Sequence, residues 1–381
     1  MTARLAFGLA MATLAWTHVA FPIVLILRSR LRARPIARKR WTPSVSVIVA
    51  AHDEAAHIAD RLDNLAAQDY PADRLEVVVA SDGSTDGTPG IAAGRDSVRV
   101  LDLPRVGKPA ALNAAVMAAS GEIIVFTDAN TVFDANAIRA LTEPFADPSV
   151  GGVAGDQRYL PGDDSAGERG HWALDRVLKR AESAAGNAVS ATGAIYAIRR
   201  ALYDPVPPGV TDDFYISTGV VSRGSRLVFA PTAIAWERVA AGDRREYARK
   251  VRIITQGLTA LLHRRDLFDV RRHGFYSIQL MTHKVLRRLS AVPLLVIAVS
   301  TALMAPRDRR IRALLAAQTI VYGLGIAGIV GGRRVAHVRA LTVPAFFCMV
   351  NAAAIHALLN VARGRRIDRW QPTHAGKRPR P

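Results

Sequence analysis

The chain has 381 residues, a formal net charge of +19 at neutral pH and one cysteine, and half of its residues are hydrophobic. The single Cys348 excludes an intrachain disulfide and lies in an apolar segment, which fits a domain that faces the cytosol. The charge invites a nucleic-acid interpretation, but the sequence has neither zinc-finger spacing nor an aromatic RNA-binding signature, so no nucleic-acid partner is expected.

The first apolar run covers residues 5–27 and contains no Asp, Glu, Lys or Arg. It is long enough to cross a bilayer. No small-residue cleavage site precedes the basic segment that follows, so a transmembrane helix within residues 1–27 is favoured over a cleaved signal peptide. Residues 28–43 then form a basic juxtamembrane linker, which includes RSRLRARPIARKR. Such clusters are typical of the cytoplasmic side of a membrane and of contact with anionic headgroups.

Residues 44–250 predict a soluble domain in which short apolar strands alternate with helices. The strands are expected in VSVIVAAHDE (45–54), LEVVVASDGSTDGT (75–88), VRVLDLP (98–104) and EIIVFTDAN (122–130), and the helices over 55–68 and 107–120. This alternation predicts an α/β fold with a mostly parallel sheet that is covered by helices on both faces.

Acidic side chains follow three of these strands. They are Asp53 and Glu54, Asp82 and Asp86, and Asp128. One acidic turn alone is most simply a helix cap. Because the C-terminal ends of parallel strands form the ligand crevice of such sheets, three acidic turns on one edge indicate a site for hydrogen-bond donors or a cation. Lys108, at the start of a helix, suits a phosphate. The sequence lacks both Walker A spacing and G-x-G-x-x-G after the first strand, which disfavours ATP-loop and dinucleotide sites.

Three further apolar segments follow the soluble domain at residues 289–305, 311–331 and 340–362, separated by arginine-rich links. We interpret 251–288 as an amphipathic interfacial segment, 289–362 as a C-terminal transmembrane region of two or three spans, and 363–381 as a basic tail. Three full crossings would place that tail outside, against the positive-inside rule, unless one segment lies in the interface or re-enters.

The motifs, taken in order, resemble those of inverting family 2 glycosyltransferases. The segments are SVIVAAHDEAAHIADRLDNLAAQDYP, VVVASDGSTDGT, GKPAALNAAV, FTDAN, GVTDDF and RKVRIITQGL. They are most similar to the bacterial membrane-embedded branch that includes poly-N-acetylglucosamine, hyaluronan and cellulose synthases and ceramide glucosyltransferases. The segments SIQLMTHKVLRRLSAVPLL and RRIDRWQPT extend the resemblance to nearly the whole chain.

This resemblance implies a GT-A fold, a nucleotide-diphosphate-sugar donor, expected to be a UDP-sugar, and a divalent cation, Mg²⁺ or Mn²⁺. It implies transfer to a lipid or a growing glycan by a multi-pass protein of the inner membrane whose catalytic domain is cytoplasmic. Two alternatives stay open. The acceptor could be a polyprenyl phosphate, or the chain could be an inactive relative that serves as an assembly component of a polysaccharide exporter.

The same resemblance assigns roles to the acidic turns. Glu54 and Asp82 would recognise the base and ribose of the nucleotide. Asp128 and Asn130 occupy the D-x-D motif that helps to hold the metal and the diphosphate. Asn130 replaces the usual second acid, and its carbonyl can still ligate a divalent cation without adding charge. Lys108 would stabilise the negative charge that develops on the leaving diphosphate.

The second half of the domain carries the expected base. Asp213 matches the last acid of the T-E-D motif, the catalytic base, and Asp212 stands where Glu is usual. Arg249 and Arg252 fall in place of the Q-x-x-R-W motif, whose Gln and Trp are missing, and would bind the donor. Two simpler interpretations compete: Asp213 as an N-terminal charge of a helix, and the two arginines as binders of lipid headgroups.

Overall fold

The computed structural model describes residues 2–37, 39–160, 166–237, 243–335, 338–365 and 367. The chain divides into two compact units. The larger unit contains residues 25–240 and 260–277, and the smaller contains 1–24, 241–259 and 278–367. Helix α9 (Asp243–His263) runs without a break through residue 250, where the sequence suggested a domain boundary.

The larger unit is built on an eight-stranded sheet of order β3-β2-β1-β4-β7-β6-β8-β5. Its first half is parallel, as predicted, and consists of β1 (Val45–Ala51), β2 (Leu75–Asp82), β3 (Val98–Leu103) and β4 (Ile123–Asp128). Its second half consists of β5 (Val132–Phe133), β6 (Val150–Tyr159), β7 (Tyr196–Arg199) and β8 (Arg226–Glu237). There, β7 is antiparallel to both β4 and β6, and β8 is parallel to β6.

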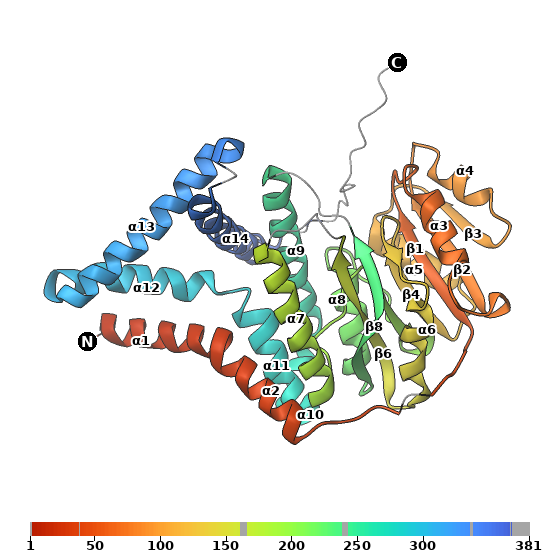
Figure 1. Cartoon of the computed structure of the whole chain (residues 1–381), viewed down its shortest axis with the longest axis horizontal. Helices are drawn as coiled ribbons and strands as arrows, with labels where there is room; N and C mark the ends of the chain where they lie inside the picture. The colour runs from red at the N-terminus through yellow and green to blue at the C-terminus, as the bar shows by residue number, and fades with distance from the viewer. Residues whose placement is uncertain are drawn as a thin grey trace, which may run out of the picture. The chain divides into compact units, whose positions relative to one another are not determined.

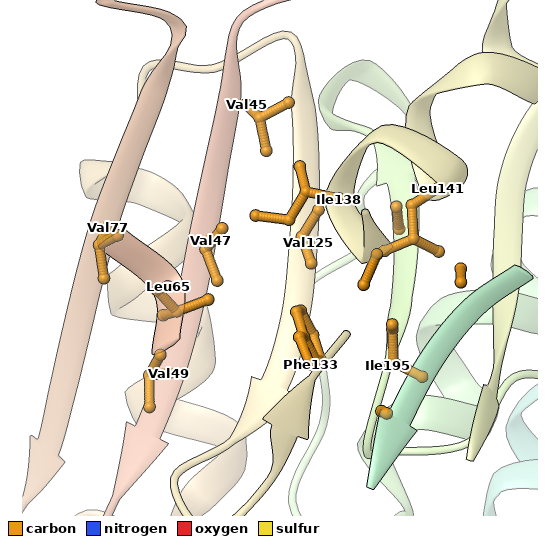
Figure 2. Packing of buried hydrophobic residues seen from close by; sticks show 14 of the residues in the cluster. Val45, Val47, Val49, Leu65, Val77, Val125, Phe133, Ile138, Leu141 and Ile195 are labelled. Carbon is orange, nitrogen blue, oxygen red and sulfur yellow. The ribbon is translucent and has the colours of Figure 1, made fainter. Parts of the chain in front are cut away.

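Buried β-branched residues explain the central strands. All seven residues of β1 are buried, which is expected of a parallel strand that is covered on both faces. On one face Val47, Val49 and Val125 pack with Leu65 of α3 (Ile58–Ala66), as Figure 2 shows. Ile138 and Leu141 of α6 (Ala137–Thr142) extend this core toward the second half of the sheet (Figure 2).

Helices α4 (Thr88–Ala93), α5 (Lys108–Ala118), α7 (Ala166–Ala185) and α8 (Asp212–Ser222) contact strands of this sheet (Figure 1). This unit also contains α10 (Val270–His273) and the start of α11 (Phe275–Leu280). The turn into β4 requires a glycine, because a Cβ on Gly121 would lie 2.5 Å from the backbone nitrogen of Ser46. Helices α5 and α8 both begin at the edge where β1, β2 and β4 end, which places their N-termini at the predicted crevice.

The smaller unit is helical and includes α1 (Thr2–Ala15), α12 (Ala291–Met304), α13 (Arg309–Gly331) and α14 (Arg339–Ala362). Helices α13 and α14 approach closely, since a Cβ on Gly328 would lie 2.5 Å from the Leu341 carbonyl oxygen. The first apolar helix continues through α2 (Phe21–Leu31), so it is longer than the predicted run.

Among the described residues, three helices are long and apolar enough to cross a membrane: Thr2–Leu31, Arg309–Gly331 and Arg339–Ala362. A fourth candidate, Phe275–Leu286 with Ala291–Arg307, is bent by 61°. Helix α12, the straight part of this pair, is about 21 Å long, less than the roughly 30 Å of a hydrocarbon core.

Candidate active site

Asp82 ends β2 and is completely buried. Its Oδ1 accepts hydrogen bonds from the backbone nitrogens of Val106 (2.7 Å) and Gly107 (2.8 Å), immediately before α5. Its Oδ2 is also buried but has no hydrogen-bond partner among the described residues. An unpaired buried carboxylate oxygen is costly, so Asp82 presents one strong acceptor to a ligand that carries an N–H or O–H group.

Glu54 lies in the turn after β1. Its backbone nitrogen donates to Thr88 Oγ1 (2.9 Å), and its Oε2 lies 2.9 Å from His57 Nδ1. Burial raises the pKa of the Glu54 carboxyl, the His57 contact opposes that rise, and the charge of Asp128 adds to it. The preceding Asp53 adopts a left-handed conformation (φ 52°), and its Oδ1 accepts from the Thr85 backbone nitrogen at 2.8 Å, which ties the β1 turn to the β2 turn.

Lys108 joins two acidic elements. Its Nζ lies 2.9 Å from Asp128 Oδ1, at the end of β4, and 3.3 Å from Asp212 Oδ2, at the start of α8. Burial disfavours the charged amine, but Asp128, Asp212 and Asp213 outweigh this effect and raise the pKa of Lys108 well above its ordinary value. Asp128 is therefore an ion-pair partner of Lys108, and a helix-cap role does not account for its side chain.

Asp213 occupies the first turn of α8, next to Asp212. Its Oδ1 accepts from the backbone nitrogen of Phe214 at 2.7 Å, so it also supplies the helix-terminal charge that the simpler interpretation offered. Asp212 Oδ2 lies 3.3 Å from Lys108 Nζ, and the charge of Asp213 also acts on Lys108. The two adjacent carboxylates are thus held differently.

Three residues near these carboxylates have buried hydroxyl oxygens for which the described part of the chain offers no hydrogen-bond partner: Thr192, Tyr196 and Thr211. Thr192 precedes Gly193, where a Cβ would lie 3.6 Å from Asp128 Oδ2, and Thr211 directly precedes Asp212. Burial first, then Asp212 and Asp213, raises the pKa of the Tyr196 phenol, which therefore stays protonated and can donate. The sequence motifs did not indicate Tyr196 or Thr211.

Asn113 of α5 fixes the segment that leads into α8. Its Oδ1 accepts from Tyr203 Oη (2.6 Å) and from the backbone nitrogen of Val206 (2.8 Å), and its Nδ2 donates to the Val206 carbonyl (3.0 Å). Asn113 lies within GKPAALNAAV, but the motif assigned it no role.

Arg61 was also missed. This arginine of α3 is 1% exposed, donates from Nη2 to Thr127 Oγ1 at 2.8 Å, and lies 4.1 Å from the centre of the Phe133 ring. Burial lowers its pKa to about 9, while Asp128 acts in the opposite direction. It supports β4 directly before Asp128.

The donor set around Asp128 suits a cation that is bound together with its substrate. Among the described residues, no three His, Cys, Asp or Glu side chains converge as a self-sufficient metal site. Asp128 offers Oδ2 beside Gly193, where only backbone occupies the neighbouring position, and Asn130 lies two residues further along. Mg²⁺ is commonly held by one or two side chains plus substrate phosphates, so these residues fit such an ion.

Arg249 and Arg252 lie on α9 and belong to the smaller unit, whereas the other predicted site residues belong to the larger unit. Arg249 Nε donates to Glu246 Oε2 at 3.0 Å. Trp236 of β8 donates from Nε1 to Asp134 Oδ1 at 2.6 Å.

Comparison with known proteins identifies the family of one domain. Residues 46–206 match the family described as Glycosyl transferase family 2. The chain carries a family 2 glycosyltransferase domain. A mannosyltransferase from Pyrobaculum calidifontis, solved with GDP-Man and Mn²⁺, is 26% identical with a TM-score of 0.72; the match covers 95% of this chain and 100% of that chain. The GT-A fold expected from the motifs is confirmed.

Curated relatives match part of this chain. A poly-β-1,6-N-acetyl-D-glucosamine synthase of Staphylococcus aureus is 26% identical over 255 residues, which cover 64% of this chain and 61% of the synthase. A synthase of the same name from Staphylococcus epidermidis is 25% identical over 204 residues, 50% of this chain and 49% of that protein. The chain therefore spans about three fifths of the length of the first relative.

Proposed function

We propose that this family 2 glycosyltransferase is a membrane-bound, metal-dependent inverting enzyme. It transfers a sugar from a nucleotide-diphosphate sugar to a hydroxyl group of a lipid or growing glycan. The observation that carries the proposal is the Lys108 ion pair with Asp128 and Asp212, which brings the D-x-D and T-E-D regions together beside Asp213. Its three candidate membrane spans support a site at the cytoplasmic face of the inner membrane.

Asp82 favours a uridine donor. Because Oδ1 is occupied by two backbone amides, only Oδ2 remains to receive a base. One acceptor fits the single ring N–H of uracil, whereas the adjacent N–H groups of guanine fit a carboxylate with both oxygens available. Glu54 lies in the neighbouring turn, where its carboxyl would reach the ribose. The Pyrobaculum mannosyltransferase was solved with GDP-Man, so the two nucleotides must be compared directly by experiment.

The side chains around Lys108 would perform the displacement. Lys108 would turn from its carboxylates to the diphosphate oxygens, where negative charge develops as the glycosidic C–O bond breaks. Asp128 and Asn130 would hold the cation, which neutralises charge on the diphosphate when bound. Asp213 would take the proton of the attacking hydroxyl while the hydroxyl oxygen bonds to the anomeric carbon from the face opposite the leaving diphosphate. The nucleoside diphosphate then leaves.

The charges near Asp213 favour a neutral acceptor over a polyprenyl phosphate. Three carboxylates surround one ammonium group, and the donor diphosphate would add further negative charge. A second phosphate would be repelled there, whereas a hydroxyl needs the base that Asp213 supplies. Transfer that is insensitive to loss of Asp213 would support the polyprenyl-phosphate alternative.

A donor screen tests the proposal. Purified full-length protein in membrane lipids would be incubated with UDP- and GDP-sugars and with Mg²⁺ or Mn²⁺, and nucleoside diphosphate release would be measured, with Asp213→Asn as the matched control. We expect metal-dependent release from at least one UDP-sugar. The absence of release from every donor, together with no nucleotide binding by calorimetry, would favour an inactive assembly component.

A further inference from the structure

A pocket of about 250 Å³ lies between the basic linker, α7 and β8, and its lining residues include none of the carboxylates described above. Two arginines line it, Arg34 from the linker and Arg180 from α7. Apolar side chains form much of the remaining wall: Pro35, Ile36, Phe229 and Pro231. The pocket therefore combines two cationic groups with an apolar surface.

Hydrogen bonds hold the linker side of this pocket in place. Arg226 of β8 donates from Nη2 to the Arg34 carbonyl (2.9 Å) and from Nε to the Gly186 carbonyl (3.0 Å). The backbone nitrogen of Arg34 donates to the Ala184 carbonyl at 2.8 Å. The linker backbone at Arg34 is therefore held against the end of α7, which fixes the point from which the Arg34 side chain reaches the pocket.

The pocket has an excess of positive charge. Within the described part of the chain, neither Arg34 nor Arg180 forms an ion pair with a carboxylate. Burial lowers the pKa of the nearby Arg226, Asp147 opposes that decrease, and the charge of Arg34 adds to it. A bound anion would relieve this repulsion.

The position in the chain indicates which anion would occupy the pocket. Leu31 is the last residue of a 30-residue apolar helix, and Arg34 follows it by three residues. Three residues of extended chain separate the two Cα atoms by at most about 11 Å. A helix of that composition ends at the headgroup layer of a bilayer. We propose that the Arg34–Arg180 pocket binds the phosphate of an anionic phospholipid, with the glycerol and upper acyl region against its apolar wall.

Native mass spectrometry of the full-length protein tests this site. The protein would be titrated with dihexanoyl phosphatidylglycerol, dihexanoyl phosphatidylcholine or inorganic phosphate, and the bound species counted. We expect the anionic lipid to bind best. Replacing both arginines in Arg34→Gln/Arg180→Gln should weaken that binding about 30-fold, or about fivefold for each charge lost near a membrane surface.

Two variants complete the design. Arg200→Gln/Arg271→Gln removes the same charge from exposed positions on other elements and should leave lipid binding unchanged. Arg180→Gln alone guards against misfolding of the linker variant and should lose about fivefold. Equal lipid binding by the double variant and the protein with both arginines would overturn the site. Inorganic phosphate that binds as tightly as the lipid would replace the lipid by a free phosphate ligand.

Discussion

At the scale of single residues, Asp212 and Asp213 differ in their partners although they are neighbours. Asp212 pairs with Lys108, and Asp213 bonds the Phe214 backbone nitrogen. We expect Asp213→Asn to keep donor affinity and to lower transfer by roughly 10²-fold or more, the usual contribution of a general base. Asp212→Asn should cost less, because Lys108 keeps Asp128 as a partner.

Donor affinity by calorimetry, beside the transfer rate of each variant, checks this assignment. A larger rate loss in Asp212→Asn would move the base to that residue. Loss of donor binding in Asp213→Asn would indicate that Asp213 binds the donor or maintains the structure.

Asp128 is predicted to serve the metal and the diphosphate. Asp128→Ala should abolish turnover while the fold remains, since Lys108 keeps Asp212 as an ion-pair partner. Asn130→Asp adds a charged ligand and should keep or raise metal affinity. The checks are thermal unfolding, metal titration by calorimetry and turnover. Near-normal turnover of Asp128→Ala at saturating metal would contradict the metal role.

Tyr196 carries a buried hydroxyl for which the described residues provide no partner. An unsatisfied buried group costs about 1–3 kcal/mol, so Tyr196→Phe should unfold at an equal or higher temperature in the absence of ligands. If substrate completes the hydrogen bond, the same variant should lose transfer by about tenfold, which corresponds to roughly 1.4 kcal/mol. Both are measured on one preparation. A lower melting temperature would show that the folded protein already satisfies the hydroxyl.

At the scale of elements, Asn113 fastens the segment between β7 and α8 to α5 through three hydrogen bonds. Asn113→Ala leaves the Val206 backbone groups without this partner and should destabilise the domain by about 2–3 kcal/mol. Because the segment leads to Asp213, transfer should fall more than donor affinity. Met117→Ala, at an 84% exposed position of the same helix, is the control and should leave stability, transfer and donor affinity unchanged. If Asn113→Ala lowers transfer and donor affinity equally, the variant is unfolded in general.

The strands that could be predicted from the sequence are those whose own residues have a strand-forming pattern. The runs in β1, β2 and β4 are apolar and β-branched and end in acids, so their sequence indicates both the strand and the edge it reaches. Strand β6 begins VGGVAG and has the glycine content of a loop. Its glycines make room for neighbours, since a Cβ on Gly152 would lie 2.9 Å from Leu227 Cδ1. That reason is tertiary and cannot be read from local propensity.

The site residues also fall into those that local sequence predicts and those that depend on tertiary contacts. Asp82, Lys108 and Asp128 follow strands or begin a helix, so the edge rule places them together before any coordinates are known. Asn113 meets Val206 across 93 residues, and Arg61 meets Thr127 across 66, so their partners depend on the completed fold. Tyr196 is hidden in a short apolar strand, where a buried tyrosine is ordinarily part of the core.

At the scale of the whole molecule, the arginine clusters favour one of two membrane topologies. If α12 re-enters, only Thr2–Leu31, α13 and α14 cross. With the basic linker inside, the cluster at residues 307–312 and the tail are then also inside, as the positive-inside rule favours. If α12 crosses, both lie outside. The length of α12, about 21 Å, favours re-entry.

Two cysteine positions distinguish these topologies on a Cys348→Ser background. Arg334→Cys lies between α13 and α14, and Arg365→Cys follows α14. With α12 re-entrant, a membrane-impermeant maleimide should label Arg334→Cys in intact cells and Arg365→Cys only after the membrane is permeabilised. A crossing α12 reverses both results, because every later segment changes side. The two cysteine variants therefore give opposite labelling patterns in the two topologies. The reversed pattern would place the basic tail outside and contradict the topology favoured by the arginine clusters.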